Sequence, residues 1–135
     1  MSAAGWDVQR AVYAALRDDA AIRAVLGDPP RLYDDAPSSA PFPYLTIGEA
    51  QTRPLEGVDG AEEHTLRLYA FSRYAGRREV KAILAAVHDA LHDAPLVLND
   101  HHLVSLRYVF ADAFRRQDRE TYQGAIRFRA VTQSL

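Results

Sequence analysis

The sequence predicts an α+β fold: a mainly antiparallel β-sheet with two α-helices packed on one of its faces. Two segments have apolar residues at helical spacing, and the segments after each of them alternate apolar and polar residues as half-buried strands do. Because the order is helix, strands, helix, strands, the helices are expected to share one face of an antiparallel sheet. The 135 residues show no linker or repeat, so we expect a single domain, residues 1–135.

The first helix is predicted from Trp6 to Leu26. Glycine at position 27, followed by "DPP", ends it, because glycine adopts a left-handed conformation readily and proline cannot continue a helix. The apolar stripe of this helix consists of Val8, Val12, Leu16, Ile22, Val25 and Leu26.

A proline-rich segment, "YDDAPSSAPFPYLTIGEA" at 33–50, joins a possible short strand at 31–35 to a strand at 44–49. Each proline fixes its own φ and favours an extended conformation in the residue before it. We interpret the segment as a rigid connector that leads into an edge strand, where a missing N–H removes no ladder bond. A partner-docking surface on this connector is the alternative.

The middle of the chain is expected to form a polar loop at 51–63, a strand at 64–72 and a helix at about 76–92. In the strand, alternation places Leu66, Leu68 and Ala70 on one face and Thr65, Arg67, Tyr69 and Phe71 on the other. The helix has a buried stripe of Val80, Ile83, Leu84, Val87 and Leu91.

The last third predicts two long strands. The first follows a turn at Asn99–Asp100 and is expected to place Val104, Leu106, Tyr108 and Phe110 on one face. After the charged turn "FRRQDRE", the strand at 121–132 directs Tyr122, Gly124, Ile126, Phe128 and Ala130 inward and Gln123, Ala125, Arg127 and Arg129 outward.

The face of the sheet that the helices leave open should therefore carry arginines and aromatic residues: Arg67, Arg107, Arg127 and Arg129 with Thr46, Tyr69 and Phe71. Arginine and tyrosine are enriched at protein interfaces. We expect a protein interface on this face; an ordinary solvated face is the alternative.

Composition excludes several classes of protein. The chain has no cysteine, hence no disulfide framework and no thiolate metal site, and no apolar run approaches the ~20 residues of a membrane span. "MSAAGWDVQR" lacks the features of a secretory signal. A net charge of −2 disfavours a dedicated nucleic-acid binder, and one lysine against fifteen arginines leaves guanidinium groups for bidentate contacts with carboxylates.

No set of residues predicts catalysis. His88 and His92 lie one helical turn apart, a spacing that can chelate a metal, but the glutamate and third ligand of a zinc protease are missing. There is no glycine-rich phosphate loop, and no acid, base and nucleophile come together. We therefore expect no enzyme activity, no metal site and no cofactor.

Four segments together resemble the tail-completion, or tail terminator, family of long-tailed phages, prophages and gene transfer agents. They are "RLYDDAPSSAPFPYLTIGEA", "HTLRLYAFSRYAGRREVKAI", "LHDAPL" and "LVSLRYVFADAFRRQDRETYQGAIRFRAVT", in this order over nearly the whole chain. The specificity lies in the ordered set, and the turn "RRQDRE" departs from the glycine-rich hairpin expected there.

The resemblance implies a structural protein without catalytic residues, assembled in the bacterial cytoplasm into the head-proximal end of a particle's tail. Such proteins form a homo-hexameric ring on the major tail tube protein, stop tube polymerisation and present a surface to the head–tail connector, a stopper or adaptor protein. DNA passes through the ring without specific binding, and no membrane is involved. A head–tail connector or neck protein, and more distantly a nucleic-acid-binding α+β module, are the alternatives.

Within that resemblance, two groups of residues receive expected roles. The subunit interface is expected at Arg67, Tyr69, Arg107, Arg127 and Arg129, which would pair with acidic side chains of a neighbouring subunit. An acidic segment from 49 to 63 would face the DNA-filled lumen, where it repels phosphates, or dock on the tube or connector. Its charged residues are Glu49, Arg53, Glu56, Asp59, Glu62 and Glu63.

Overall fold

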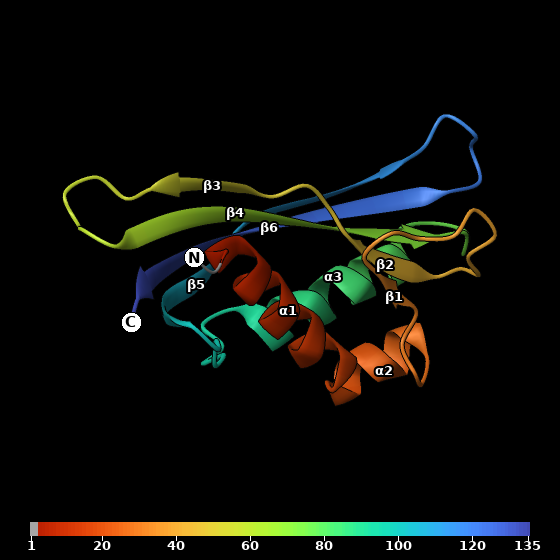
Figure 1. The fold of residues 1–135 in the computed structure, drawn as a ribbon. Coiled ribbons are helices and arrows are strands. Elements are labelled where there is room, and N and C mark those ends of the chain that lie inside the picture. The colour runs from red at the N-terminus through yellow and green to blue at the C-terminus, as the bar shows by residue number, and fades with distance from the viewer. Residues whose placement is uncertain (1–2) are drawn as a thin grey trace.

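A computed structural model describes residues 3–135 of the chain, which form three helices and a six-stranded, mostly antiparallel sheet (Figure 1). The predicted α+β class is confirmed, with three helices where two were expected. The helices are α1 (Ala4–Arg17), α2 (Ala20–Leu26) and α3 (Arg78–Leu91). The strands are β1 (Leu32–Tyr33), β2 (Tyr44–Ile47), β3 (Gln51–Pro54), β4 (Ala61–Ser72), β5 (His101–Arg115) and β6 (Tyr122–Ser134).

The additional helix arises because the predicted helix from Trp6 to Leu26 is broken at Asp18 and Asp19. Asp18 caps the C-terminus of α1, and the Asp19 carboxylate accepts a hydrogen bond of 3.0 Å from the backbone N–H of Ile22. Aspartate is a strong N-cap, so this contact starts a new helix in a new direction. Gly27, with φ of 94°, ends α2 as expected.

The sheet has the order β1-β2-β4-β6-β5, with β3 also paired to β4. Only β1 and β2 run parallel among these strands. The predicted polar loop at 51–63 is wrong in part, because β3 and the first residues of β4 form a hairpin within it. All four residues of β3 are exposed, so no apolar alternation marked this strand, and backbone pairing alone defines it.

The proline-rich connector leads into β2, which lies between β1 and β4 and is therefore not the edge strand that we expected. The last proline, Pro43, precedes the strand, so no ladder bond is lost. Arg31 holds the connector to the sheet: its Nε donates a hydrogen bond of 2.7 Å to the Pro43 carbonyl, and its own carbonyl accepts one of 3.0 Å from the Leu45 N–H.

The alternation predicted for β5 is wrong at Phe110. The register places Tyr108 opposite Phe128 and Phe110 opposite Arg127, with an irregularity between them. A β-bulge adds one residue to a strand, so every side chain after it changes face. A second irregularity, between Leu103 and Ser105, leaves Val104 52% exposed.

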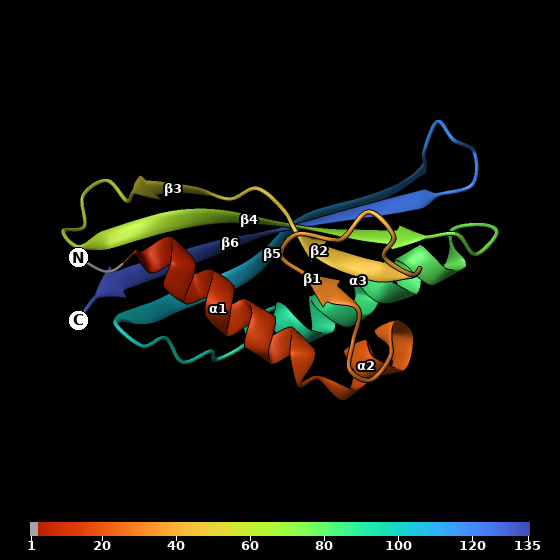
Figure 2. The same cartoon turned by 45° about the vertical axis from the view of Figure 1, so that its right-hand side comes forward.

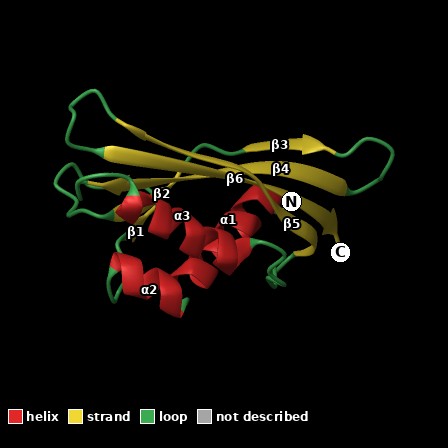
Figure 3. Ribbon diagram, turned by 180° about the vertical axis from the view of Figure 1, so that it is seen from behind, coloured by secondary structure: helices red, strands yellow, loops and turns green. Residues whose placement is uncertain are grey.

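All three helices lie on one side of the sheet, and its opposite face is uncovered (Figures 2 and 3). The core lies between these layers, with Leu16 of α1, Ile83 of α3, Leu68 of β4 and Phe128 of β6 each at most 1% exposed. Burying a side chain of this size contributes about 1.5–3 kcal/mol to folding. This two-layer packing leaves the outer face of β4, β5 and β6 available for a partner.

Candidate subunit interface on the open face of the sheet

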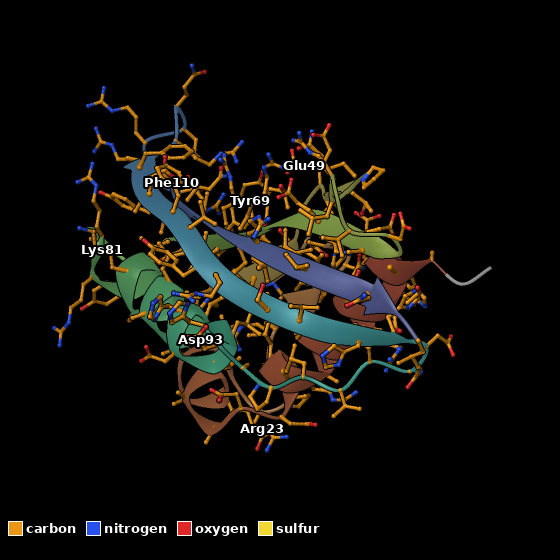
Figure 4. All side chains as sticks on the ribbon, turned by 90° about the vertical axis from the view of Figure 1, so that its left-hand side faces the viewer. Arg23, Glu49, Tyr69, Lys81, Asp93 and Phe110 are labelled. Atoms are coloured by element: carbon orange, nitrogen blue, oxygen red, sulfur yellow. The ribbon has the colours of Figure 1, made fainter. Side chains whose placement is uncertain are left out.

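The four arginines of the predicted interface start from strand positions on the open face, as the alternation indicated for β4 and β6. The register pairs Arg67 of β4 directly with Arg127 of β6, and pairs Arg129 of β6 with Arg107 of β5. Figure 4 places Glu49, Tyr69 and Phe110 on the side of the sheet away from Arg23 and Asp93, which belong to the helical layer.

A hollow of about 240 Å³ opens on this face beside the Arg67–Arg127 pair. Phe110 and Phe114, which are 44% and 43% exposed, form an apolar part of its wall. The Arg127 guanidinium lies 5.5 Å from the centre of the Phe110 ring, and its Nε is buried without a hydrogen-bond partner among residues 3–135. The complete lining is Arg67, Tyr69, Phe110, Asp112, Phe114, Gln123, Ala125, Ile126 and Arg127.

Sequence reasoning missed Phe110 and Phe114. The strict alternation assigned Phe110 to the inner face, and only the bulge before it brings both rings outward. Charged and aromatic side chains around one hollow are typical of the anchor regions of protein interfaces.

Tyr69 is held on the open face by Glu49. The Tyr69 hydroxyl donates a short hydrogen bond to Glu49 Oε1. This bond raises the pKa of Tyr69 and lowers that of Glu49, because it favours the phenol together with the carboxylate. Tyr69 of the predicted interface is thus in direct contact with Glu49 of the predicted acidic segment.

Two of the four arginines have carboxylate partners within the chain. Arg129 donates to Glu63 Oε2 from Nε at 2.7 Å and from a terminal nitrogen at 2.6 Å. Arg107 Nε lies 3.3 Å from Asp93, which follows α3 in the helical layer, so its side chain turns around the sheet edge. Arg67 and Arg127, the other two of the four, form no salt bridge with any residue in the range 3–135.

The predicted acidic segment is distributed along the β3–β4 hairpin. Arg53 lies on β3, and its Nε is 3.4 Å from Glu63 on β4. Glu56 and Asp59 are exposed in the turn, and Glu62 is opposite Pro54. Glu63 therefore lies between Arg53 and Arg129. These two contacts connect the β3–β4 hairpin to Arg129 on the open face.

The histidine pair of α3 lies elsewhere. The rings of His88 and His92 stack with centres 5.1 Å apart, and His92 Nδ1 accepts a hydrogen bond of 3.0 Å from the Tyr108 N–H. Within residues 3–135, no group of three or more His, Cys, Asp or Glu side chains is placed to hold a metal ion. None of the described helices is long and apolar enough to cross a membrane.

The open face of the sheet thus combines Arg67 and Arg127, which lack a salt bridge within residues 3–135, with exposed aromatic rings, a combination typical of surfaces that bind other proteins. Comparison with protein families gives a match to the family described as "Tail completion protein gp17" over residues 10–133. No curated protein sequence matches the chain. Among solved structures, a chain from "Virion of native gene transfer agent (GTA) particle" shares 32% identity with a TM-score of 0.84, and the match covers 94% of this chain and 95% of that one.

The chain therefore belongs to the tail completion protein gp17 family, as the resemblance indicated. This family consists of structural proteins of phage tails and is not an enzyme family.

Proposed function

We propose that this protein is the tail terminator of a phage-like particle. It forms a hexameric ring on the head-proximal end of the tail tube, stops the addition of tube subunits and joins the tail to the head connector. DNA passes through the ring without specific binding. Family membership over residues 10–133 and the similarity to a chain of a gene transfer agent particle support this proposal.

The observation that carries the assembly role is the Arg67–Arg127 pair. Like charges directly opposite each other on neighbouring strands are destabilising in a monomer. An acidic side chain of an adjacent subunit that entered the hollow would neutralise both guanidinium groups and supply a partner for Arg127 Nε. Phe110 and Phe114 would lose solvent exposure in the same contact. Such a contact joins two different surfaces and repeats from copy to copy, so it closes into a ring of six where successive copies are related by a sixfold rotation.

The ring needs further surfaces for its two axial partners. The exposed charges of the β3–β4 hairpin keep the two roles expected from the sequence, docking on the tube end or connector and repulsion of DNA in the lumen. Of this group, Glu56 and Asp59 lie in the hairpin turn, and Glu49, Arg53, Glu62 and Glu63 lie outside it.

Deletion of the gene in the producing strain tests the proposal. Negative-stain microscopy is expected to show overlong tails without heads beside tailless capsids. Tails of normal length that fail to join heads would instead identify a neck protein. Normal particles of normal tail length would refute both roles.

The charge reversal Arg127→Glu tests the interface. Glu at this position would pair with Arg67 across the strands, so the monomer is expected to stay folded, with an unchanged circular dichroism spectrum, while ring assembly is lost. The matched control is Lys81→Glu, which reverses an exposed charge on α3 in the helical layer (Figure 4). Normal assembly of Arg127→Glu, or its failure to fold, would refute this interface.

A further inference from the structure

One end of the sheet carries an arginine-lined groove that shares no lining residue with the hollow beside Arg67 and Arg127. Its volume is about 630 Å³, and it lies between the proline-rich connector, the end of β4 and the β5–β6 turn. The lining residues are Ser38, Ser39, Ala40, Phe42, Tyr44, Phe71, Arg73, Arg116, Asp118 and Thr121.

Both arginines of the groove are held in place by neutral contacts. The Arg73 guanidinium lies 4.4 Å from the centre of the Phe42 ring, and its Nε donates to Thr121 Oγ1 at 3.2 Å. Arg116 lies 5.9 Å from the centre of the Phe71 ring and donates to Gln123 Oε1 at 2.7 Å. In the described part of the chain, neither arginine forms a salt bridge. Arg73 is nevertheless close enough to the Asp118 carboxylate for the two charges to attract each other.

The carboxylate in the groove is already engaged. Asp118 accepts hydrogen bonds from the Thr121 hydroxyl at 2.7 Å, from the Thr121 N–H at 2.8 Å and from the Glu120 N–H at 2.9 Å. These bonds, the one from the Thr121 side chain first, lower the pKa of Asp118 to about 2. Asp118 thus closes the β5–β6 turn, and its single negative charge against two arginines leaves the groove lining with a net positive charge for another anion.

Aromatic rings form the floor of the groove. Tyr44 stacks on Phe71 with ring centres 4.9 Å apart, and Phe42 lies 5.2 Å from Tyr44. A segment that carries carboxylates beside an apolar side chain would match this combination of guanidinium groups and rings.

Such a segment is present at the opposite end of the same molecule. The turn of the β3–β4 hairpin, residues 55–60, exposes Glu56 and Asp59 on either side of Val58, which is 44% exposed. Gly57 and Gly60, with φ of 82° and 76°, allow the tight turn. Neither carboxylate forms a salt bridge with any residue from 3 to 135. Figure 1 shows this turn and the β5–β6 turn at opposite ends of the sheet.

The hairpin turn cannot reach the groove of its own chain. At about 3.3 Å per residue, the twelve residues of β4 alone separate the two ends by roughly 40 Å. We propose that the groove between Arg73 and Arg116 receives the β3–β4 hairpin turn of a neighbouring copy, with Glu56 and Asp59 facing the two arginines and Val58 facing the rings. The contact is head-to-tail and rests on the proposed function, because it would link successive copies of the ring. In this arrangement Glu56 and Asp59 face a neighbouring copy, and the axial roles pass to the charges outside the turn: Glu49, Arg53, Glu62 and Glu63.

Nucleic acid fits the groove less well than an acidic protein segment does. A phosphate-binding site gains affinity from every cation it contains, whereas Asp118 lines this groove and Glu120 adjoins it. The net charge of −2 also opposes binding of a polyanion.

Cysteine cross-linking tests the contact, since the chain has no cysteine of its own. One cysteine replaces Val58 at the hairpin turn and a second replaces Ser39 at the exposed rim of the groove. A short bis-maleimide is added to particles that carry the double variant V58C/S39C, and to the concentrated purified protein. A head-to-tail contact is expected to give a ladder of species up to the hexamer on a denaturing gel. Each single variant is the control and is expected to give no species larger than a dimer.

Charge reversal then tests the pairing itself in the double-cysteine background. Both R73E/R116E and E56K/D59K are expected to lower the cross-linked fraction by about tenfold or more, equivalent to roughly 1.4 kcal/mol in association. The combination of all four reversals in one chain restores opposite charges across the contact and is expected to recover the ladder. K81E, which reverses an exposed charge on α3 in the helical layer, is expected to leave the ladder unchanged.

The outcomes separate this contact from the proposed function. Normal particles without a ladder would overturn the contact and leave the tail terminator role intact. A ladder in the purified protein, together with normal tails after gene deletion, would retain the contact and refute the role. A DNA mobility shift that R73E/R116E abolishes, without a ladder, would show that the groove binds nucleic acid and would overturn the proposal.

Discussion

Replacement of Asp7 should destabilise the fold at a position outside the proposed subunit contacts. It lies in the first turn of α1 and is 5% exposed. Its carboxylate accepts hydrogen bonds from the Asn99 N–H at 3.0 Å, the Asp100 N–H at 2.9 Å and His101 Nδ1 at 3.1 Å. Arg10 donates a fourth, at 2.7 Å. One side chain therefore connects the start of the chain to the start of β5.

Replacement of Asp7 by alanine removes every acceptor for these donors at once. Hydrogen bonds to a charged group contribute about 1.5–3 kcal/mol each, but their effects are not additive, and breaking a buried charged pair costs about 3–5 kcal/mol. We expect Asp7→Ala to lower the free energy of unfolding by about 3–5 kcal/mol, a large part of the ~5–15 kcal/mol of a typical domain. Urea unfolding measures this loss. The m-value, which is the slope of the unfolding free energy against urea concentration, should stay unchanged if the native state keeps its compactness.

Stability at low pH gives a second measurement of the same contact. Burial raises the pKa of Asp7, but the hydrogen bonds from Asn99, Asp100, Arg10 and His101 outweigh it, so the pKa lies well below the ordinary value of 3.8. A carboxyl group whose pKa is lower in the folded than in the unfolded chain stabilises the fold at pH values above its unfolded-state pKa. This stabilisation is lost as the pH falls below that pKa. Asp7→Ala should therefore show a flatter decline in stability below pH 3.8 than the wild-type protein.

The matched control is Asp18→Ala, which removes an exposed carboxylate that pairs with Arg17 and Arg23 at the surface. Exposed pairs contribute about 0–1 kcal/mol, so this variant is expected to stay close to the wild type. The reasoning would be refuted if Asp7→Ala lowered the free energy of unfolding by less than about 1 kcal/mol, or if the variant lost stability below pH 3.8 as steeply as the wild type does.

Two further substitutions test other parts of the fold. His64 is fully buried between Thr52 Oγ1 at 2.9 Å and Thr132 Oγ1 at 2.8 Å, and burial lowers its pKa below 6.5. Just below pH 6.5 the unfolded chain binds a proton at His64 and the folded chain does not, so the free energy of unfolding should decrease as the pH is lowered through this range. Thermal melts of His64→Gln should show a smaller decrease, and an equal decrease would contradict this reasoning. Alanine at Gly48 would place its Cβ against the Tyr69 ring and 3.1 Å from the Arg67 carbonyl. Gly48→Ala should cost about 1–3 kcal/mol and release Tyr69 from Glu49, so an absorbance titration that still showed a raised tyrosine pKa would exclude this effect.

Much of the open face could be predicted from the sequence because side chains alternate with a period of two along a regular strand. This period alone placed Arg67 and Tyr69 on the outer face of β4 and Arg127 and Arg129 on the outer face of β6. Helical periodicity likewise located α3 and both parts of the first helical region. These are local properties, and each can be read within a window of one strand or helix.

The features that the sequence analysis missed are those without a local sequence pattern. The apolar stripe continues across the break at Asp18 and Asp19, and the exposed residues of β3 carry no alternation. The bulge before Phe110 adds one residue to β5, and nothing in the residue types shows where a strand changes phase. Asp7 lies on the buried face of α1, and no pattern in the sequence marked it.

By itself the sequence determined the order of the elements, the residues that face away from the helices along β4 and β6, and the family resemblance. Tertiary structure alone decided which of the polar groups meet. Asp7 and Asp100 are separated by 93 positions, and the Glu63–Arg129 pair by 66, yet each makes a direct hydrogen bond. Arg67 and Arg127, by contrast, become facing like charges only through the β4–β6 register. That register depends on packing of the whole inner face against the helices, because a slip of one residue would bring every buried side chain to the surface.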